Sequence, residues 1–123
     1  MTKIVLSWET GTLSVEQISE YKDDIGSVQC SVSWDAGATA FASLNAFINE
    51  ESLLEFMQST KRVVSDLSGS ATLHSMEGDV EITLELKDGK GSVRGRLELP
   101  DSLGSLEFYG PTDQSLVLSR GNE

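Results

Sequence analysis

Few residues in this chain have the types and spacing that catalysis or metal binding requires. His74 is the only histidine, and it lies in the segment TLHSM with no nucleophile motif such as GxSxG near it. Glu81 and Glu107 could serve as a pair of catalytic carboxylates, but so acidic a chain offers many equivalent pairs. One histidine, one cysteine and no dense Asp/Asn loop ending in Glu give no metal-ligand pattern. We therefore predict that the protein is not an enzyme and carries no cofactor or metal ion.

The spacing of side chains can also indicate a binding surface. The clearest candidate is the segment 79–99, DVEITLELKDGKGSVRGRLEL. Apolar and polar side chains alternate on both sides of Asp88-Gly89, which predicts a β-hairpin. A turn centred there places Leu84 opposite Val93 and keeps the apolar side chains on one face. The opposite face then gathers charged and aromatic side chains from neighbouring strands, namely Glu81, Arg94, Arg96, Glu107 and Tyr109.

Two interpretations of this polar face remain open. It can be a solvated sheet surface, in which opposed charges alternate and discourage aggregation. It can also be a flat binding surface, because arginine and tyrosine are enriched in protein interfaces. If the chain has a binding surface, we expect it at these five residues.

The elements that position this face are strands with a period of two residues. Alternation and turn signals predict a hairpin over 3–8 and 12–18, a half-buried strand over 27–34, and a four-stranded meander over 70–109. Between 38 and 48 the small side chains allow either Leu44 or Phe47 to point inward. The segment 115–120 fits a short edge strand or a single helical turn.

One segment, residues 50–67, has helical periodicity. Asn49 is a suitable N-cap, and Glu50 and Glu51 suit the positive end of the helix dipole. The expected buried stripe is Leu53, Phe56, Met57, Thr60, Val64 and Leu67. We predict an α+β fold in a single domain over 1–123: a curved antiparallel meander of seven to nine strands with the helix on its apolar face. The pattern does not decide whether the N-terminal hairpin joins that sheet or forms a second layer.

Composition limits the partners that such a domain can have. Twenty acidic residues against nine basic ones give a formal net charge of -11, which disfavours nucleic acid and anionic membranes. A basic protein is the electrostatic complement, although the same charge also suits a solvated surface. Cys30 has no disulfide partner within the chain, the start MTKIVLSWE lacks a signal-peptide pattern, and no apolar run could span a membrane. We expect a cytoplasmic protein.

A family resemblance covers residues 27–116. Its segments are SVQCSVSW, ESLLEFMQSTKRVVSDLSG, ATLHSMEGDVEITLELKDGKGSVRGRLEL and SLEFYGPTDQSL, and Asp113-Gln114-Ser115 is the most distinctive part. In this order they resemble the small immunity proteins, and their uncharacterised relatives, associated with WapI-type polymorphic toxins of bacteria.

The resemblance implies a protein that binds and neutralises a toxin domain, often a nuclease. An acidic protein can be steered onto the basic cleft with which a nuclease holds phosphates. The alternatives are a protein- or carbohydrate-binding module unrelated to toxins and, less favoured, a small hydrolase that uses His74 or a carboxylate pair.

Overall fold

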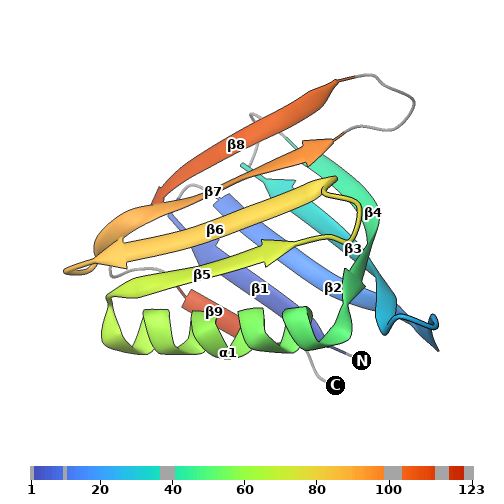
Figure 1. Cartoon of the computed structure of the whole chain (residues 1–123). Helices are drawn as coiled ribbons and strands as arrows, with labels where there is room; N and C mark the ends of the chain where they lie inside the picture. Colours follow the sequence, from blue (N-terminus) through green and yellow to red (C-terminus); the bar gives the residue numbers. More distant parts are fainter. Residues whose placement is uncertain (1, 10, 37–40, 99–103, 113–116, 121–123) are drawn as a thin grey trace.

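The strands form two antiparallel sheets that face each other (Figure 1). The computed structural model describes residues 2–9, 11–36, 41–98, 104–112 and 117–120. Asp113-Gln114-Ser115 lies outside them, as does most of the turn that the sequence indicates from Asp101 to Gly104. Within these residues the first sheet has the order β4-β3-β2-β1-β9, with bounds Phe41–Asn49, Ser27–Asp35, Gly11–Lys22, Lys3–Trp8 and Val117–Arg120. The second has the order β5-β6-β7-β8, with bounds Gly69–His74, Val80–Lys87, Lys90–Glu98 and Ser105–Thr112. The predicted α+β class is confirmed. The N-terminal hairpin, β1 and β2, belongs to the first sheet and not to the sheet of the predicted meander.

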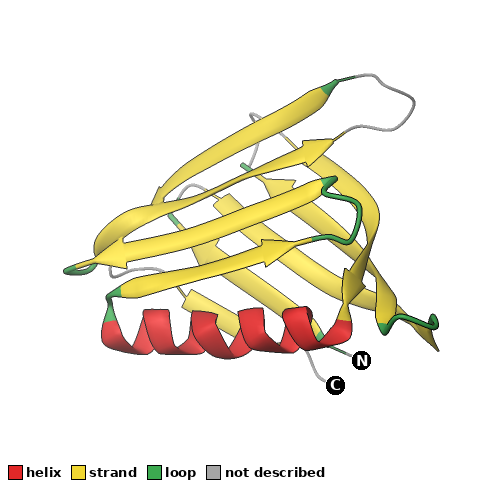
Figure 2. Cartoon of the chain, viewed as in Figure 1, coloured by secondary structure: helices red, strands yellow, loops and turns green. Residues whose placement is uncertain are grey.

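The helix α1, Glu50–Asp66, lies along one open edge of the two sheets (Figure 2). It packs mainly on β5 and makes smaller contacts with β4, β6 and β9. We expected the apolar side chains from Val80 to Leu106 to rest on the helix, but the first sheet lies opposite most of them. A helix about 10 Å wide cannot cover four strands spaced about 4.8 Å apart, and the first sheet has an apolar face of its own to bury.

Capping residues define both ends of α1, and the C-cap limits how far its buried stripe extends. Asn49 caps the helix as predicted, because its Oδ1 accepts hydrogen bonds from the backbone N of Glu51 (3.0 Å) and of Ser52 (3.2 Å). Leu67 was expected in the buried stripe, but it is the C-cap, with a left-handed φ of 56°, and it is 36% exposed. The chain leaves the helical path there, and Val63 occupies the last buried position in its place.

The register of the second sheet follows the predicted turns. Leu84 pairs with Val93 across Asp88-Gly89, and Val80 pairs with Leu97. In the first sheet, the structure settles the ambiguous strand. Ala46 and Ile48 of β4 are buried and Phe47 points outward, so the face that contains Leu44 is the inner one.

Candidate functional site

All five predicted site residues lie on the outer face of the second sheet. Arg96 of β7 pairs with Glu81 of β6 on one side and with Glu107 of β8 on the other. In the next row, Arg94 lies between Thr83 and Tyr109. The predicted grouping is therefore confirmed, because a period of two and a fixed register place these side chains on the same face. Their role in binding stays a prediction.

These side chains surround a hollow of about 590 Å³ that opens to solvent. Its lining consists of Glu81, Thr83, Arg94, Gly95, Arg96, Glu107 and Tyr109. Gly95 of β7 contributes backbone to this lining. Its register with Ile82 and Phe108 is continuous, and because Ile82 is buried, the side-chain position of Gly95 is on the inner face of the sheet, away from the hollow.

Both arginines of the hollow have carboxylate neighbours. Arg96 lies 3.5 Å from Glu81 and 3.8 Å from Glu98, and its Nη2 donates a hydrogen bond to the carbonyl of Gly78 (3.3 Å). Arg94 lies 4.0 Å from Glu85. These side chains are partly or well exposed, so each ion pair contributes only about 0 to 1 kcal/mol and a partner can replace it. The acids outnumber the arginines, which makes this face unsuited to a phosphate.

Tyr109 is the most exposed aromatic side chain of the hollow, at 65%. It stands beside Arg94 on the edge strand β8. An exposed ring next to a guanidinium group offers apolar area and hydrogen-bond donors with little side-chain entropy to lose. The arrangement is suited to recognition.

The histidine considered for catalysis lies outside the hollow of β6–β8, whereas Glu81 and Glu107 both line that hollow. His74 borders a separate hollow of about 320 Å³, where Ser52, Glu55 and Ser59 of α1 face β5. Sequence spacing gave no signal for this gathering, because the helix and the strand meet only in the folded chain. No hydrogen bond joins the His74 ring to these groups in the described part of the chain.

The described residues include no group of side chains that matches a metal site. No set of three or more His, Cys, Asp or Glu side chains is close enough to hold a metal ion there. Cys30 is fully buried, and desolvation raises the pKa of its thiol from 9.0 to about 11, which keeps it protonated and unreactive at neutral pH. None of the helices in the described segments is long and apolar enough to cross a membrane.

A second surface feature was not predicted from the sequence. Ile25, Phe47 and Met76 are exposed and border one pocket, although they come from three different parts of the chain. Nothing in their separate segments marks them as a group, because each looked like an ordinary position of a turn or strand.

Comparison of the chain with protein-family models, with curated proteins and with solved structures finds no match.

Proposed function

We propose that this protein is a non-catalytic binding protein for a basic protein domain, and that it acts as an immunity protein in the bacterial cytoplasm. Its partner would be a toxin domain with nuclease activity, which it neutralises by occupying the basic cleft. The observation that carries the proposal is the outer face of β6, β7 and β8. There, five predicted residues from three strands line one open hollow.

The physical case rests on preorganisation and charge. The hollow is built on paired strands, so little backbone order has to be gained on binding. Its ion pairs are weak enough for Arg94 and Arg96 to exchange Glu85 and Glu81 for groups of the partner. The net charge of -11 accelerates association with a cationic domain, most strongly at low ionic strength. The resemblance to WapI-associated immunity proteins supports a toxin as that domain.

The test is co-expression with a candidate nuclease toxin domain taken from the coding sequences next to this one, scored by survival of the cells. Wild-type protein should protect, and the purified pair should associate more slowly as salt is added. The double variant Arg94→Ala/Tyr109→Ala should lose protection and bind at least about 30-fold more weakly, because one interface hot spot is worth about 2 kcal/mol or more.

Lys61→Ala/Arg62→Ala on the exposed face of α1 is the matched control and should behave as wild type. Failure of the wild-type protein to protect would reject the immunity function. Full protection by the Arg94/Tyr109 variant would place the interface on another surface.

A further inference from the structure

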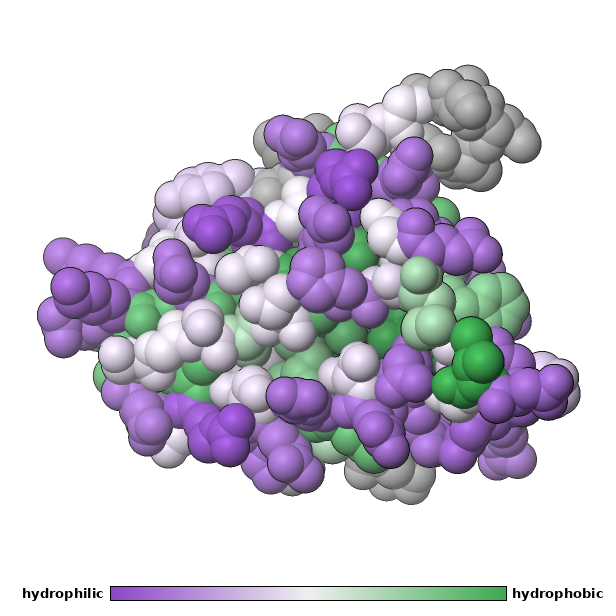
Figure 3. Space-filling view, in the orientation of Figure 1, coloured by the Kyte–Doolittle hydropathy of each residue, from purple (hydrophilic) through white to green (hydrophobic). Residues whose placement is uncertain are grey.

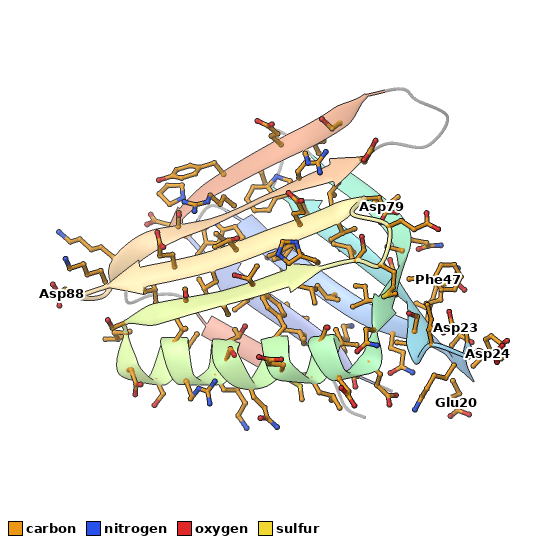
Figure 4. The ribbon with its side chains drawn as sticks, viewed as in Figure 1. Glu20, Asp23, Asp24, Phe47, Asp79 and Asp88 are labelled. Carbon is orange, nitrogen blue, oxygen red and sulfur yellow. The ribbon has the colours of Figure 1, made fainter. Side chains whose placement is uncertain are left out.

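One end of the molecule exposes large apolar side chains that belong to no predicted site. Ile25 in the β2–β3 turn is 63% exposed, Phe47 near the end of β4 is 47% exposed, and Met76 in the β5–β6 turn is 46% exposed. Figure 3 shows hydrophobic surface at the end of the molecule where Figure 4 labels Phe47, with hydrophilic side chains around it. Exposed apolar groups gathered inside a polar rim are typical of a binding site.

Backbone hydrogen bonds hold the three segments together. The N of Met76 donates to the carbonyl of Phe47 (2.9 Å), which fastens the β5–β6 turn to the first sheet. The N of Glu50 donates to the carbonyl of Gly26 (2.9 Å), and Asp23 Oδ1 accepts from the N of Ile25 (3.1 Å). The exposed side chains therefore stand on a fixed framework that exists before any ligand arrives.

Between these segments lies a pocket of about 460 Å³, lined by Asp23, Ile25, Ser27, Phe47, Met76 and Glu77. Ser27 is only 1% exposed, and its Oγ has no hydrogen-bond partner in the part of the chain that the structure describes. A buried hydroxyl without a partner destabilises the fold unless something else satisfies it. Ser27 Oγ is shielded from solvent, so a ligand in the pocket would meet its exposed apolar walls and the carboxylates of its lining.

The charges around the pocket select the kind of ligand. Asp23 and Glu77 belong to the lining, and Figure 4 shows Glu20 and Asp24 at the same end of the molecule. The nearby cation Lys22 is already paired with Glu50 at 2.7 Å. A second copy of this chain would bring like charges together, and nucleic acid or anionic lipid would be repelled in the same way.

We propose that this pocket receives an arginine side chain from a basic segment of a partner protein. The aliphatic stem packs between Ile25 and Met76, and the guanidinium group stacks on the ring of Phe47. Its N–H groups donate to the carboxylate of Glu77. Arginine fits better than lysine because its planar, weakly hydrated head can stack on a ring and donate in several directions at once. The pocket shares no residue with the hollow of β6–β8, so its ligand does not depend on the proposed function.

The test is an NMR titration of the methyl groups of Ile25 and Met76. The probe is the peptide acetyl-Gly-Arg-Gly-amide, and the reference peptide carries citrulline, which has nearly the same shape without the charge. The arginine peptide should give saturable shifts with a Kd of about 1 to 10 mM, as befits one side chain. The citrulline peptide should bind at least about fivefold more weakly, since hydrogen bonds to charged groups are the stronger ones.

Three variants assign the contacts. Phe47→Ala should abolish saturation, and Glu77→Gln should weaken binding about two- to fivefold, within the range of an exposed ion pair. Ser27→Ala should leave binding unchanged and raise the stability of the unliganded protein, since it removes an unsatisfied hydroxyl that is shielded from the ligand.

Matched controls lie outside the pocket lining. Leu54→Ala and Glu55→Gln on α1 remove an exposed apolar group and an exposed charge, and Tyr109→Ala alters the hollow of β6–β8; all three should leave the titration unchanged. The proposal would be overturned if the citrulline peptide gave equal shifts or if the corresponding lysine peptide bound more tightly. It would also be overturned if the arginine peptide gave no saturable shift at concentrations well above the expected Kd.

Discussion

Gly110→Ala should destabilise the protein, because Gly110 of β8 is where the second sheet meets the ring of Trp8 in β1. A Cβ added there would lie 2.7 Å from Trp8 Cζ2 and 2.9 Å from both Cε2 and Nε1. Ordinary carbon contacts are about 3.5 to 4.0 Å, so the ring or the strand must move by roughly 1 Å.

The indole ring of Trp8 has little room to move away from such a methyl group. Trp8 is buried, its centroid is 5.2 Å from that of Trp34, and Cζ2 would lie only 3.1 Å from a Cβ added at Gly11. Overpacking in a close-packed core costs about 1 to 3 kcal/mol, and a ring confined on two sides belongs in the upper half of that range. We expect the free energy of unfolding to fall by about 2 to 3 kcal/mol, which lowers Tm by about 10 °C for a chain of this size.

Urea denaturation followed by far-UV circular dichroism measures the effect without relying on tryptophan emission. The variant Trp8→Phe, made alone and together with Gly110→Ala, completes a double-mutant cycle. Because phenylalanine lacks the outer part of the indole, it should relieve the clash and give a coupling energy of at least about 1 kcal/mol. Additive losses, or a Gly110→Ala protein as stable as wild type, would show that the two sheets do not meet at this contact.

Three further predictions concern local features. Asn49→Ala should lower the free energy of unfolding by about 1 kcal/mol in urea denaturation, because the cap on two backbone N–H groups is lost, whereas Asn49→Ser should retain most of it. Leu67→Gly should raise the free energy of unfolding by about 0.5 to 1 kcal/mol, since glycine adopts the left-handed C-cap conformation without strain. Leu67→Ala should give no such gain, and equal stability of the glycine and alanine variants would refute the reasoning. Burial raises the pKa of Cys30 from 9.0 to about 11, so the folded protein should lose up to about 3 kcal/mol relative to Cys30→Ala as pH rises from about 9 to about 11, whereas the difference between the two proteins should be constant below pH 9; parallel pH profiles would contradict this.

Prediction from sequence worked best where neighbouring residues carry the information. The pairing of Leu84 with Val93 follows from the Asp88-Gly89 turn and from alternation, and the same register placed Arg94 and Arg96 on the outer face. Asn49 identified the start of the helix for an equally local reason. The grouping of the predicted site residues on one face could therefore be predicted from the sequence.

Prediction was less complete where distant segments compete for the same space. Leu67 fits the helical stripe by period, yet the backbone turns at that residue and exposes it. Phe47 and Leu44 had equal claims to the interior, because both faces of that strand carry small or apolar side chains; only packing in the folded chain decided between them.

The sequence by itself determined the strands, the helix, the turns and the side-chain alternation, because these depend on periods and caps that span only a few residues. Tertiary structure alone decided that the strands divide into two facing sheets with the helix along one edge. It also decided that Ile25, Phe47 and Met76 border a single pocket. These outcomes depend on how the apolar faces of remote segments pack against one another. The free energy of burying an apolar face depends little on which other apolar surface covers it, so local sequence patterns do not specify the partner.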